Sequence, residues 1–307
     1  MANIVVVGSL AIDLVFRVKR RPSLGEAVVA DGFGMFLGGK GFNQAVAARR
    51  AGASVGLIGK LGNDPFAEMF ETALDAEGID RKGVLRSPEG TGVAAPVVDT
   101  SGQNSIVVAL RANLALSDVD IVAQARQFRT ATVVVAQRET SESSLLATAR
   151  LSRECGARFI LNAAPAGQID PEVWGLVDLL VVNEGEAETI AGRSVADEPT
   201  VWQTAERLQA LGPPIVIITL GERGSALLDG RQRHRIASIS VEAVDTTGAG
   251  DAYVGALAAE LARGASVLEA ATFANVAGGL AVTTLGAEPS LPRREAIEHR
   301  LRSSGGG

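Results

Sequence analysis

The 307-residue chain is poor in several residue types, and each shortage removes a class of function. Its one cysteine, Cys155, cannot form an intrachain disulfide, which suits a reducing cytoplasm. Its two histidines, His234 and His299, make a histidine-based triad or metal site unexpected. No cluster of lysine and arginine offsets the net charge of −6, so we expect no nucleic-acid partner.

Long apolar runs are missing as well. No run is long enough to cross a membrane, so we expect no membrane partner. The opening stretch MANIVVVGSL has neither a basic region nor a long apolar core. It therefore predicts a first β-strand rather than a signal peptide, and we expect a cytoplasmic protein.

The common phosphate-binding loops are absent. The stretch GMFLGGKG at Gly34–Gly41 nearly matches a P-loop, but Gly41 stands where the Mg²⁺-binding hydroxyl belongs. The stretch VDTTGAGDAY at 244–253 fails as a dinucleotide fingerprint, because Tyr253 replaces its third glycine. No His-Glu-x-x-His motif occurs, and the Gly-x-Ser-x-Gly stretch at Gly52–Gly56 is no nucleophile elbow, because it precedes a predicted strand instead of following one.

Short apolar runs alternate with amphipathic segments along most of the chain. The runs predict strands at Ile4–Val7, Val55–Ile58, Thr132–Ala136, Phe159–Leu161, Leu179–Val182 and Ile215–Thr219. The other segments predict helices at Phe42–Arg50, Phe66–Ala76, Ser143–Glu154, Glu184–Ala191, Thr200–Leu211, Asp251–Arg263, Val267–Thr284 and Arg293–Leu301. Strands that are apolar throughout are covered on both faces, so we expect an α/β fold with a doubly wound, mostly parallel sheet and helices on both faces.

Two segments, residues 14–37 and 91–109, break this alternation. They hold short alternating runs, such as Ala27–Ala30 and Val93–Val98, and a hairpin turn is predicted at Asp99–Gly102. We interpret them as a small β-sheet lid inserted into an α/β domain of residues 1–13, 38–90 and 110–307. Such a lid could cover a site at the carboxyl ends of the strands, where open α/β sheets bind ligands. Additional edge strands of the main sheet are the alternative.

The stretch VDTTGAGDAY places glycines and carboxylates at the start of a predicted helix. Gly248, Ala249 and Gly250 leave backbone N–H groups uncovered, and these groups with the helix dipole form an anion site that needs no lysine. Asp251 could then act as a general base in phosphoryl transfer to a hydroxyl. A second carboxylate, Asp245, would repel the phosphate unless a cation lay beside it. An ordinary helix start with an acidic first turn is the alternative.

Three further stretches could contact ligands. Gly38–Gly41 lets the backbone approach a small molecule, and Asn43 offers a donor and an acceptor to hydroxyl groups. Asn183 and Glu186 follow a predicted strand and could hold Mg²⁺ through waters, although this pattern is also typical of a helix cap. Thr219–Gly224 lies at another strand end, with glycines suited to a nucleotide.

These four motifs, in this order, resemble the ribokinase-like (PfkB) family of carbohydrate kinases. LGGKGFNQAVAARRAG is similar to the family's N-terminal signature and VDTTGAGDAYVGAL to its C-terminal one, and the likeness spans nearly the whole chain. NAAPAG, NEGEAE, TLGERG and GAEPSLP resemble the ribokinase branch most. The resemblance implies an α/β domain with a β-sheet lid that is often shared in a homodimer. It also implies ATP, Mg²⁺ and a hydroxymethyl acceptor.

Residue roles follow from this resemblance by matching motifs. It implies that Asp251 is the base and that Gly248, Ala249 and Gly250 form the anion hole. The positions that match sugar contacts are Ala11, Asp13, Gly39, Lys40, Gly41, Asn43, Glu139 and Asp251. The nucleotide positions are Asn183, Thr219, Gly221, Gly224, Gly250 and Asn275, with Glu186 on the Mg²⁺ side through water. The positions for a monovalent cation, K⁺, are Asp245, Thr247, Ala281, Thr284, Gly286 and Ser290.

One departure concerns the acceptor. The ribokinase branch usually reads Gly-Ser-x-Asn-x-Asp at the first strand end, and here Ala11 replaces the asparagine. Loss of one such hydrogen bond costs about 0.5–1.5 kcal/mol, which opens the acceptor to a deoxysugar, another furanose or a nucleoside. We therefore expect ATP-dependent phosphorylation of the primary hydroxyl of a small, ribose-like sugar. The alternatives are a nucleoside kinase of the same family and, from another class, a non-catalytic sugar or nucleotide sensor.

Overall fold

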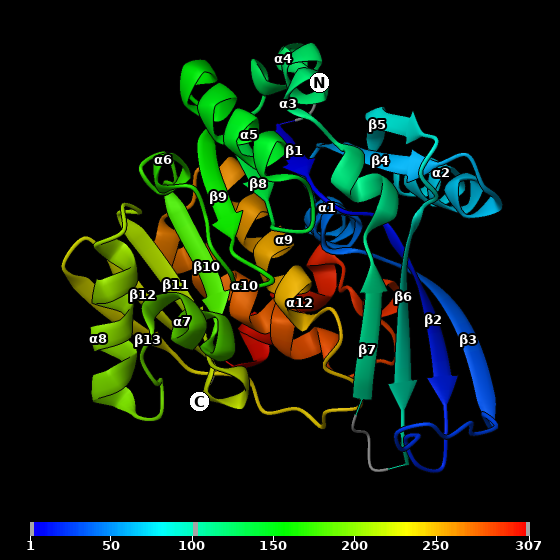
Figure 1. The fold of residues 1–307 in the computed structure, drawn as a ribbon. Coiled ribbons are helices and arrows are strands. Elements are labelled where there is room, and N and C mark those ends of the chain that lie inside the picture. The colour runs from blue at the N-terminus through cyan, green and yellow to red at the C-terminus, as the bar shows by residue number, and fades with distance from the viewer. Residues whose placement is uncertain (1–2, 101–103, 305–307) are drawn as a thin grey trace.

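Nine strands form the main sheet of the computed structural model, which describes residues 3–100 and 104–304. Across the sheet the strands follow the order β13-β12-β11-β10-β9-β8-β1-β4-β5, and only β12 and β13 run antiparallel to their neighbours (Figure 1). The strands are β1 Ile4–Val7, β4 Val55–Gly62, β5 Asp80–Ser87, β8 Val133–Ala136, β9 Arg158–Asn162, β10 Leu179–Asn183, β11 Ile215–Thr219, β12 Ser225–Asp229 and β13 Gln232–Ile236.

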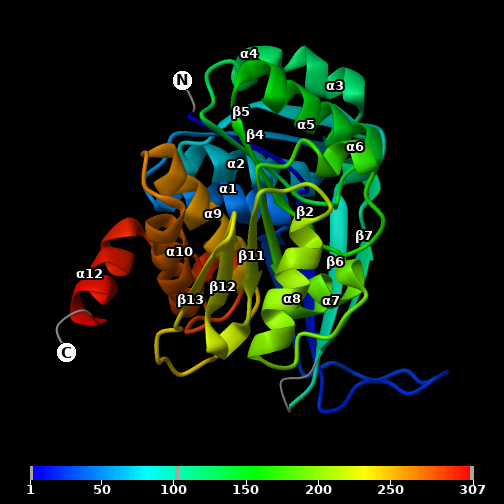
Figure 2. The ribbon, with the colours of Figure 1, turned by 90° about the vertical axis from the view of Figure 1, so that its left-hand side faces the viewer.

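Helices cover both faces of this sheet, as Figure 2 shows. One apolar core joins the sheet to α1 Lys40–Arg50, α2 Pro65–Glu77, α9 Ala249–Ala262, α10 Val267–Ala281 and α12 Arg294–Ser304. The other joins it to α3 Asp118–Ala123, α4 Ala125–Phe128, α5 Glu142–Cys155, α6 Pro171–Trp174, α7 Glu184–Ala191 and α8 Glu198–Gln209. Short pieces complete the chain: 3₁₀ turns η1 Arg111–Ala115 and η2 Gly221–Arg223, and α11 Ala287–Ser290.

The predicted α/β class is confirmed, and the differences are elements that were not predicted and the ends of two helices. The strands β5, β12 and β13 were not predicted, since they carry charged residues and lack a continuous apolar run. The helix predicted to reach Thr284 ends at Ala281, and α9 begins at Ala249, two residues before its predicted start. Among the described residues, no helix is both long enough and apolar enough to span a lipid bilayer.

A second, separate sheet has the order β3-β2-β6-β7. Its strands are β2 Ala11–Arg17, β3 Gly32–Gly38, β6 Gly92–Val98 and β7 Asn104–Ala109. The alternative of additional edge strands on the main sheet was therefore wrong. A strand at Ala27–Ala30 was also wrong, because that segment is irregular and the strand starts at Gly32. The predicted turn at Asp99–Gly102 lies partly outside the described residues, and β2 begins three residues before the predicted lid segment.

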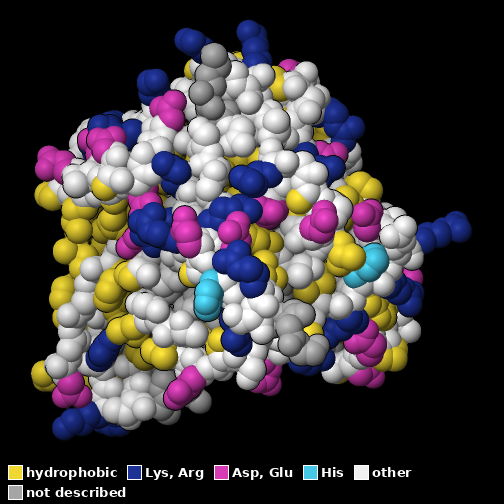
Figure 3. All heavy atoms as spheres, turned by 180° about the vertical axis from the view of Figure 1, so that it is seen from behind, with side chains coloured by type: hydrophobic (Ala, Val, Ile, Leu, Met, Phe, Trp, Pro, Cys, Tyr) yellow, Lys and Arg dark blue, Asp and Glu magenta, His cyan; other side chains and the backbone are white. Residues whose placement is uncertain are grey.

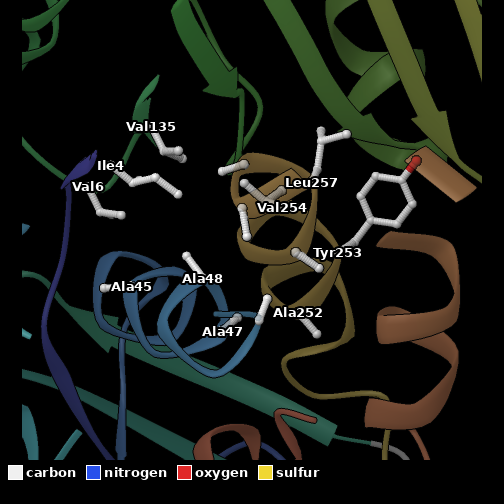
Figure 4. Close-up of a cluster of buried hydrophobic side chains, with 14 of the residues drawn as sticks. Ile4, Val6, Ala45, Ala47, Ala48, Val135, Ala252, Tyr253, Val254 and Leu257 are labelled. Carbon is white, nitrogen blue, oxygen red and sulfur yellow. The ribbon is translucent and has the colours of Figure 1, made fainter. Parts of the chain in front are cut away.

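Two helices from distant parts of the sequence, α1 and α9, pack unusually closely. A Cβ atom at Gly255 would lie 2.5 Å from Ala47 Cβ and 2.7 Å from the carbonyl oxygen of Gln44. Short side chains, including Ala48 and Ala252, fill this contact together with strand residues of the main sheet (Figure 4). Because such small residues let two backbones approach, the amino-terminal turns of both helices lie side by side.

The order of the strands reverses at β1. From β1 the sheet continues through β4 to β5 on one side, and the chain later returns to add β8 on the other. Open α/β sheets bind ligands outside the carboxyl ends of the strands at such a switch point. Gly8 follows β1 and Gln137 follows β8, so these two residues mark where a site is expected.

Candidate active site

Glycines bring the start of α1 onto the end of β1. Gly39 caps α1 with a φ of 88°, and a Cβ there would lie 2.7 Å from the backbone nitrogen of Ala11. A Cβ at Gly41 would lie 2.4 Å from the carbonyl carbon of Gly8. Any side chain at these positions would push the two segments apart. The glycines therefore fix where α1 begins and where its side chains project.

Asp251 lies in the first turn of α9 and is 8% exposed. Both of its carboxylate oxygens accept hydrogen bonds from α1. Asn43 Nδ2 donates to Oδ2 and Gln44 Nε2 donates to Oδ1, each at 2.9 Å. The carboxylate is thus held by two neutral amides and is neutralised by no direct ion pair among the described residues.

Asp13 and Glu139 complete a group of carboxyl groups around Lys40. Burial raises the pKa of Asp13 to about 7, and the charges of Glu139 and Asp251 add to this effect, while Lys40 opposes it. Burial lowers the pKa of Lys40, but the surrounding carboxylates outweigh burial and raise it overall. Lys40 therefore stays a cation among acids, and Asp13 changes its charge near neutral pH.

The first turn of α9 has no side-chain cap, and its N-cap residue, Gly248, has a φ of 82°. A Cβ at Gly248 would lie 3.0 Å from Ala287 Cα, whereas a Cβ at Gly250 would meet nothing within 4 Å. The N–H group of Ala249 donates to Thr246 O at 3.3 Å, a weak turn bond. Open space over an uncapped helix start fits an anion.

The predicted nucleotide residues lie at the carboxyl ends of β10 and β11. Asn183 and Thr219 are paired in register, and Thr219 Oγ1 donates to Val182 O at 3.4 Å. Gly221 is the first residue of η2 and Gly224 directly follows it, and both have positive φ angles. Asn275 on α10 is buried and donates to Ala237 O at 2.7 Å. These residues lie around the carboxyl ends of β10 and β11. Asn275 forms no direct hydrogen bond with Asn183 or Thr219.

Asn183 and Glu186 form a capping box at the start of α7. Asn183 Oδ1 accepts the N–H of Glu186 at 2.8 Å, and Glu186 Oε2 accepts the N–H of Asn183 at 2.9 Å. The predicted helix cap is thus present. Burial raises the pKa of Glu186, and the charge of Asp251 raises it further. The N–H group of Asn183 and the charge of Lys40 oppose this rise. The carboxyl group of Glu186 therefore faces the same group of charges as Asp251.

Asp245 ties together the two segments of the predicted cation site. Its Oδ1 accepts the N–H and hydroxyl of Thr247, and its Oδ2 accepts the N–H of Gly286 at 2.9 Å. The N–H groups of Val244 and Asp245 donate to Val282 O. Burial opposes ionisation of Asp245, but these hydrogen bonds outweigh it and lower the pKa. The other predicted residues of this site, Ala281, Thr284 and Ser290, lie on the same carboxyl-terminal segment, where Ser290 Oγ donates to Ala287 O.

Ala11, the departure from the family pattern, is 5% exposed and lies next to Gly38 and Gly92 in the small sheet. Its neighbour along the chain, Leu10, is held by Asn113, whose amide bonds both Leu10 N and Leu10 O at 2.9 Å. The backbone at this position is therefore fixed, and the methyl group of Ala11 offers no hydrogen bond to a ligand.

Sequence reasoning missed four buried polar residues of this site. Ser9 Oγ donates to Glu139 Oε2 at 2.5 Å, and Gln44, Gln137 and Asn162 form hydrogen bonds with one another or with Asp251. A signal was present, because Gln137 and Asn162 each close an apolar strand with a polar residue. Gln44 directly follows Asn43, and only the packing of α1 on α9 shows that it faces Asp251.

The structure thus combines a doubly wound sheet, a separate small sheet and a group of acids that includes the buried Asp251. A family model described as pfkB family carbohydrate kinase matches residues 1–294. The chain belongs to this family, and it is an enzyme, a carbohydrate kinase.

Several known proteins are similar to this chain. The bifunctional ribokinase/ribose-5-phosphate isomerase A of Fructilactobacillus sanfranciscensis is 37% identical over 97% of the chain, which spans 56% of that relative's length. The ribokinase of Mus musculus is 36% identical over 96% of this chain and 94% of its own. The deoxyribokinase of Salmonella typhi is 32% identical over 97% and 98%. The structure of Arabidopsis thaliana ribokinase complexed with ribose and ATP has a TM-score of 0.90 and 31% identity, over 98% of this chain and 99% of that one.

Proposed function

We propose that this carbohydrate kinase transfers the γ-phosphoryl group of ATP to the primary hydroxyl group of a small furanose sugar. The observation that carries the proposal is the buried carboxylate of Asp251 beside the uncapped start of α9. Similarity to a ribokinase complexed with ribose and ATP supports a sugar and ATP as the substrates.

In this proposal Asp251 accepts the hydroxyl proton as the sugar oxygen attacks the γ-phosphorus. The bond to the bridging oxygen breaks, and ADP leaves. Backbone N–H groups at Gly248–Gly250 stabilise the negative charge that spreads over the γ-phosphoryl oxygens. These oxygens occupy the open space over Gly250. Asp13, Lys40, Asn43 and Glu139 bind the sugar hydroxyl groups. Asn43 Oδ1 supports this role, since it is buried without a hydrogen-bond partner and can accept from a hydroxyl.

The nucleotide lies in this proposal against Asn183, Thr219, Gly221, Gly224 and Asn275. Glu186 would hold Mg²⁺ through water, which suits an ion that keeps much of its hydration shell. When bound, Mg²⁺ neutralises charge between the phosphate groups. The position of Glu186 within the electrostatic reach of Lys40 and Asp251 supports this placement.

A monovalent cation, K⁺, would bind beside the anion site. Ionised Asp245 and the backbone carbonyls of residues 281–290 are oxygen donors of the kind that hard cations prefer. Oδ1 of Asp245 accepts two hydrogen bonds from Thr247, whereas Oδ2 accepts one from Gly286 and retains a further lone pair for a cation. A bound cation would remove the repulsion between Asp245 and a phosphate.

Ala11 favours a second candidate acceptor, a 2-deoxysugar. A methyl group offers nothing to a sugar hydroxyl, and one relative is named a deoxyribokinase. We also propose a homodimer joined through the small sheet. Exposed hydrophobic side chains of β3 and β7 support it, and Figure 3 shows hydrophobic side chains gathered on the side where this sheet lies. A cytoplasmic location stays a prediction.

The test is ADP release over a panel of ribose, 2-deoxyribose, other furanoses and nucleosides, with ATP and Mg²⁺, in K⁺ and in tetramethylammonium. We expect turnover with a furanose and a higher rate in K⁺. Asp251→Asn should keep the fold, measured by thermal unfolding, and lower kcat by roughly 10²–10⁴-fold, the usual contribution of a general base. Near-normal turnover of this variant contradicts the role of Asp251. A ligand-induced thermal shift without ADP release would favour a sensor.

A further inference from the structure

A chain of buried amides leads from the end of β8 to the carboxylate of Asp251. Gln137 Nε2 donates to Gln44 Oε1 at 2.7 Å, and Gln44 Nε2 donates to Asp251 Oδ1 at 2.9 Å. Gln44 Nε2 also donates to Asn162 Oδ1 at 3.0 Å. Gln44 and Gln137 have no exposed surface, and Asn162 is 8% exposed. The four residues come from α1, α9 and the ends of two neighbouring strands.

Two groups that can only accept hydrogen bonds determine the orientation of every amide in this chain. The carbonyl of Val181 accepts from Asn162 Nδ2 at 3.1 Å, so Asn162 must turn its oxygen toward Gln44. The carboxylate of Asp251 also requires a donor, so Gln44 must present its NH₂ group to both. Its oxygen then faces Gln137, which must donate. A flipped Gln44 would place an oxygen against two other oxygens, so only one orientation is stable.

The oxygen at the far end of this chain shows how tightly the residues are placed. Gln137 Oε1 is buried and has no hydrogen-bond partner, and a Cβ at Gly8 would lie 2.0 Å from it. A buried amide oxygen without a partner is unfavourable, because it has lost its hydrogen bonds with water. Gly8 has no side chain that would clash with this oxygen. In this position of Gln137, its Nε2 donates to Gln44.

We infer that Gln44 is a positioning residue for phosphoryl transfer, which rests on the proposed role of Asp251 as the base. Gln44 and Asn43 each hold one carboxylate oxygen, so the carboxylate cannot rotate about its Cβ–Cγ bond. Each oxygen keeps a further lone pair that can accept the proton of the substrate hydroxyl. The amides orient the base without adding a formal charge. Gln137 and Asn162 hold Gln44 in the one orientation in which it donates.

Replacement of Gln44 by residues of similar size tests this role. Gln44→Met removes the donor, so the carboxylate rotates and its ionised form loses a hydrogen bond. We expect kcat to fall roughly 10- to 100-fold, because misplacement of a reacting group by about 1 Å has an effect of this size. The acid limb of the pH profile of kcat/KM should move up by about one pH unit. The KM for ATP should stay within about threefold.

Gln44→Glu should reverse the pH dependence. When protonated, the introduced carboxyl group can still donate one hydrogen to Asp251, whereas its ionised form repels Asp251. We expect this variant to lose activity as pH rises, while Gln44→Met loses most at low pH. The charged groups around Asp251 are Lys40, Asp13 and Glu186. They are unchanged in both variants, so the difference between the two profiles reports the contact with Asp251.

Gln209→Met is the matched control. Gln209 Nε2 donates to Pro214 O and Gly230 O at 2.8 and 2.9 Å, at the opposite edge of the sheet. This variant loses two hydrogen bonds, and its kcat and pH profile should match the wild type. If Gln44→Met does not fold, the nearly isosteric Gln44→Glu carries the test. If the Gln44 variants keep the wild-type pH profile, or if both variants show the same pH dependence, the positioning role of Gln44 is overturned. Normal turnover of Asp251→Asn would instead refute the proposed function.

Discussion

At the scale of single residues, the site holds several carboxyl groups whose burial and mutual repulsion raise the pKa of Asp13 and Glu186. Asp13 lies near Glu139 and Asp251, with Lys40 as the cation that faces them. Sugar hydroxyl groups are donors that would favour the ionised form of Asp13. The sequence motif predicted Asp13 as a sugar contact, but the raised pKa of Asp13 depends on burial and on neighbours that are remote in sequence.

The raised pKa of Asp13 gives a prediction for stability. The unfolded chain releases this proton near pH 3.8, and the folded protein keeps it to about pH 7. Between these values the folded state binds more protons, so the free energy of unfolding falls as pH rises. Asp13→Asn should therefore be more stable than the wild type by about 1–3 kcal/mol at pH 8 and equal to it below pH ~4.

Chemical denaturation at a series of pH values measures this difference. Asp31→Asn, at an exposed position of the segment between β2 and β3, serves as the control and should leave the pH dependence unchanged. If Asp13→Asn and the wild type showed parallel stability curves from pH 4 to pH 8, the burial of this charge would have no cost.

At the scale of elements, the contact between α1 and α9 builds the site. It carries Asn43 and Gln44 to Asp251, and no bulky side chain separates the helices at Gly255. Sequence periodicity predicted both helices, and the short side chains at their contact allow close packing. Periodicity does not specify which two helices meet, since several helices of this chain present alanine-rich faces.

Gly255→Ala tests the close contact. Alanine raises helix propensity by about 1 kcal/mol over glycine. Its Cβ would nevertheless lie 2.5 Å from Ala47 Cβ, so the helices must move apart. We expect a net loss of about 1–3 kcal/mol in the free energy of unfolding and a lower kcat, because Gln44 moves away from Asp251.

Gly175→Ala is the control for this substitution. Gly175 has a φ of −70°, and a Cβ there would lie 3.6 Å from Glu172 O, an ordinary contact. This variant should keep its stability or gain about 0.4–1 kcal/mol. Equal stabilities for the two variants would show that the helices at Gly255 can adjust without cost.

At the scale of the whole molecule, the small sheet leaves apolar side chains in solvent. Val107 on β7 is 74% exposed and Phe33 on β3 is 61% exposed. The segment of residues 18–31 projects away from the body of the protein, as Figure 2 shows, and its Leu24 and Val29 are fully or almost fully exposed. Apolar side chains on a projecting sheet and loop are typical of a surface that another chain covers.

A second copy of the chain is the partner that we predict. Light scattering after size exclusion should give about twice the chain mass of 31.6 kDa. Val107→Glu should give the monomer mass, because it places a charge within the apolar contact. Val119→Glu, at a 72% exposed position on α3, should leave the mass unchanged. A monomer at every concentration of the wild-type protein contradicts the dimer.

The sequence by itself determined most elements and the class of fold. Apolar runs and helical periodicity are local properties, and they specified every parallel strand of the main sheet except β5, most helices and the segments that form the small sheet. The order of the motifs was sufficient for the resemblance to the family. The importance of glycine at positions 39 and 248 could also be inferred from the sequence, because glycine allows a backbone conformation that other residues rarely adopt.

Only the tertiary structure decided how the site is held together. Gln44 and Asp251 are 207 residues apart, and Ser9 and Glu139 are 130 apart. Whether such side chains meet depends on the approach of two helices and on the order of strands, which no local pattern encodes. The same packing makes Gln44 the donor that orients the predicted base, because Gln44 Nε2 faces two acceptors, Asn162 and Asp251, and Gln44 Oε1 faces the donor Gln137.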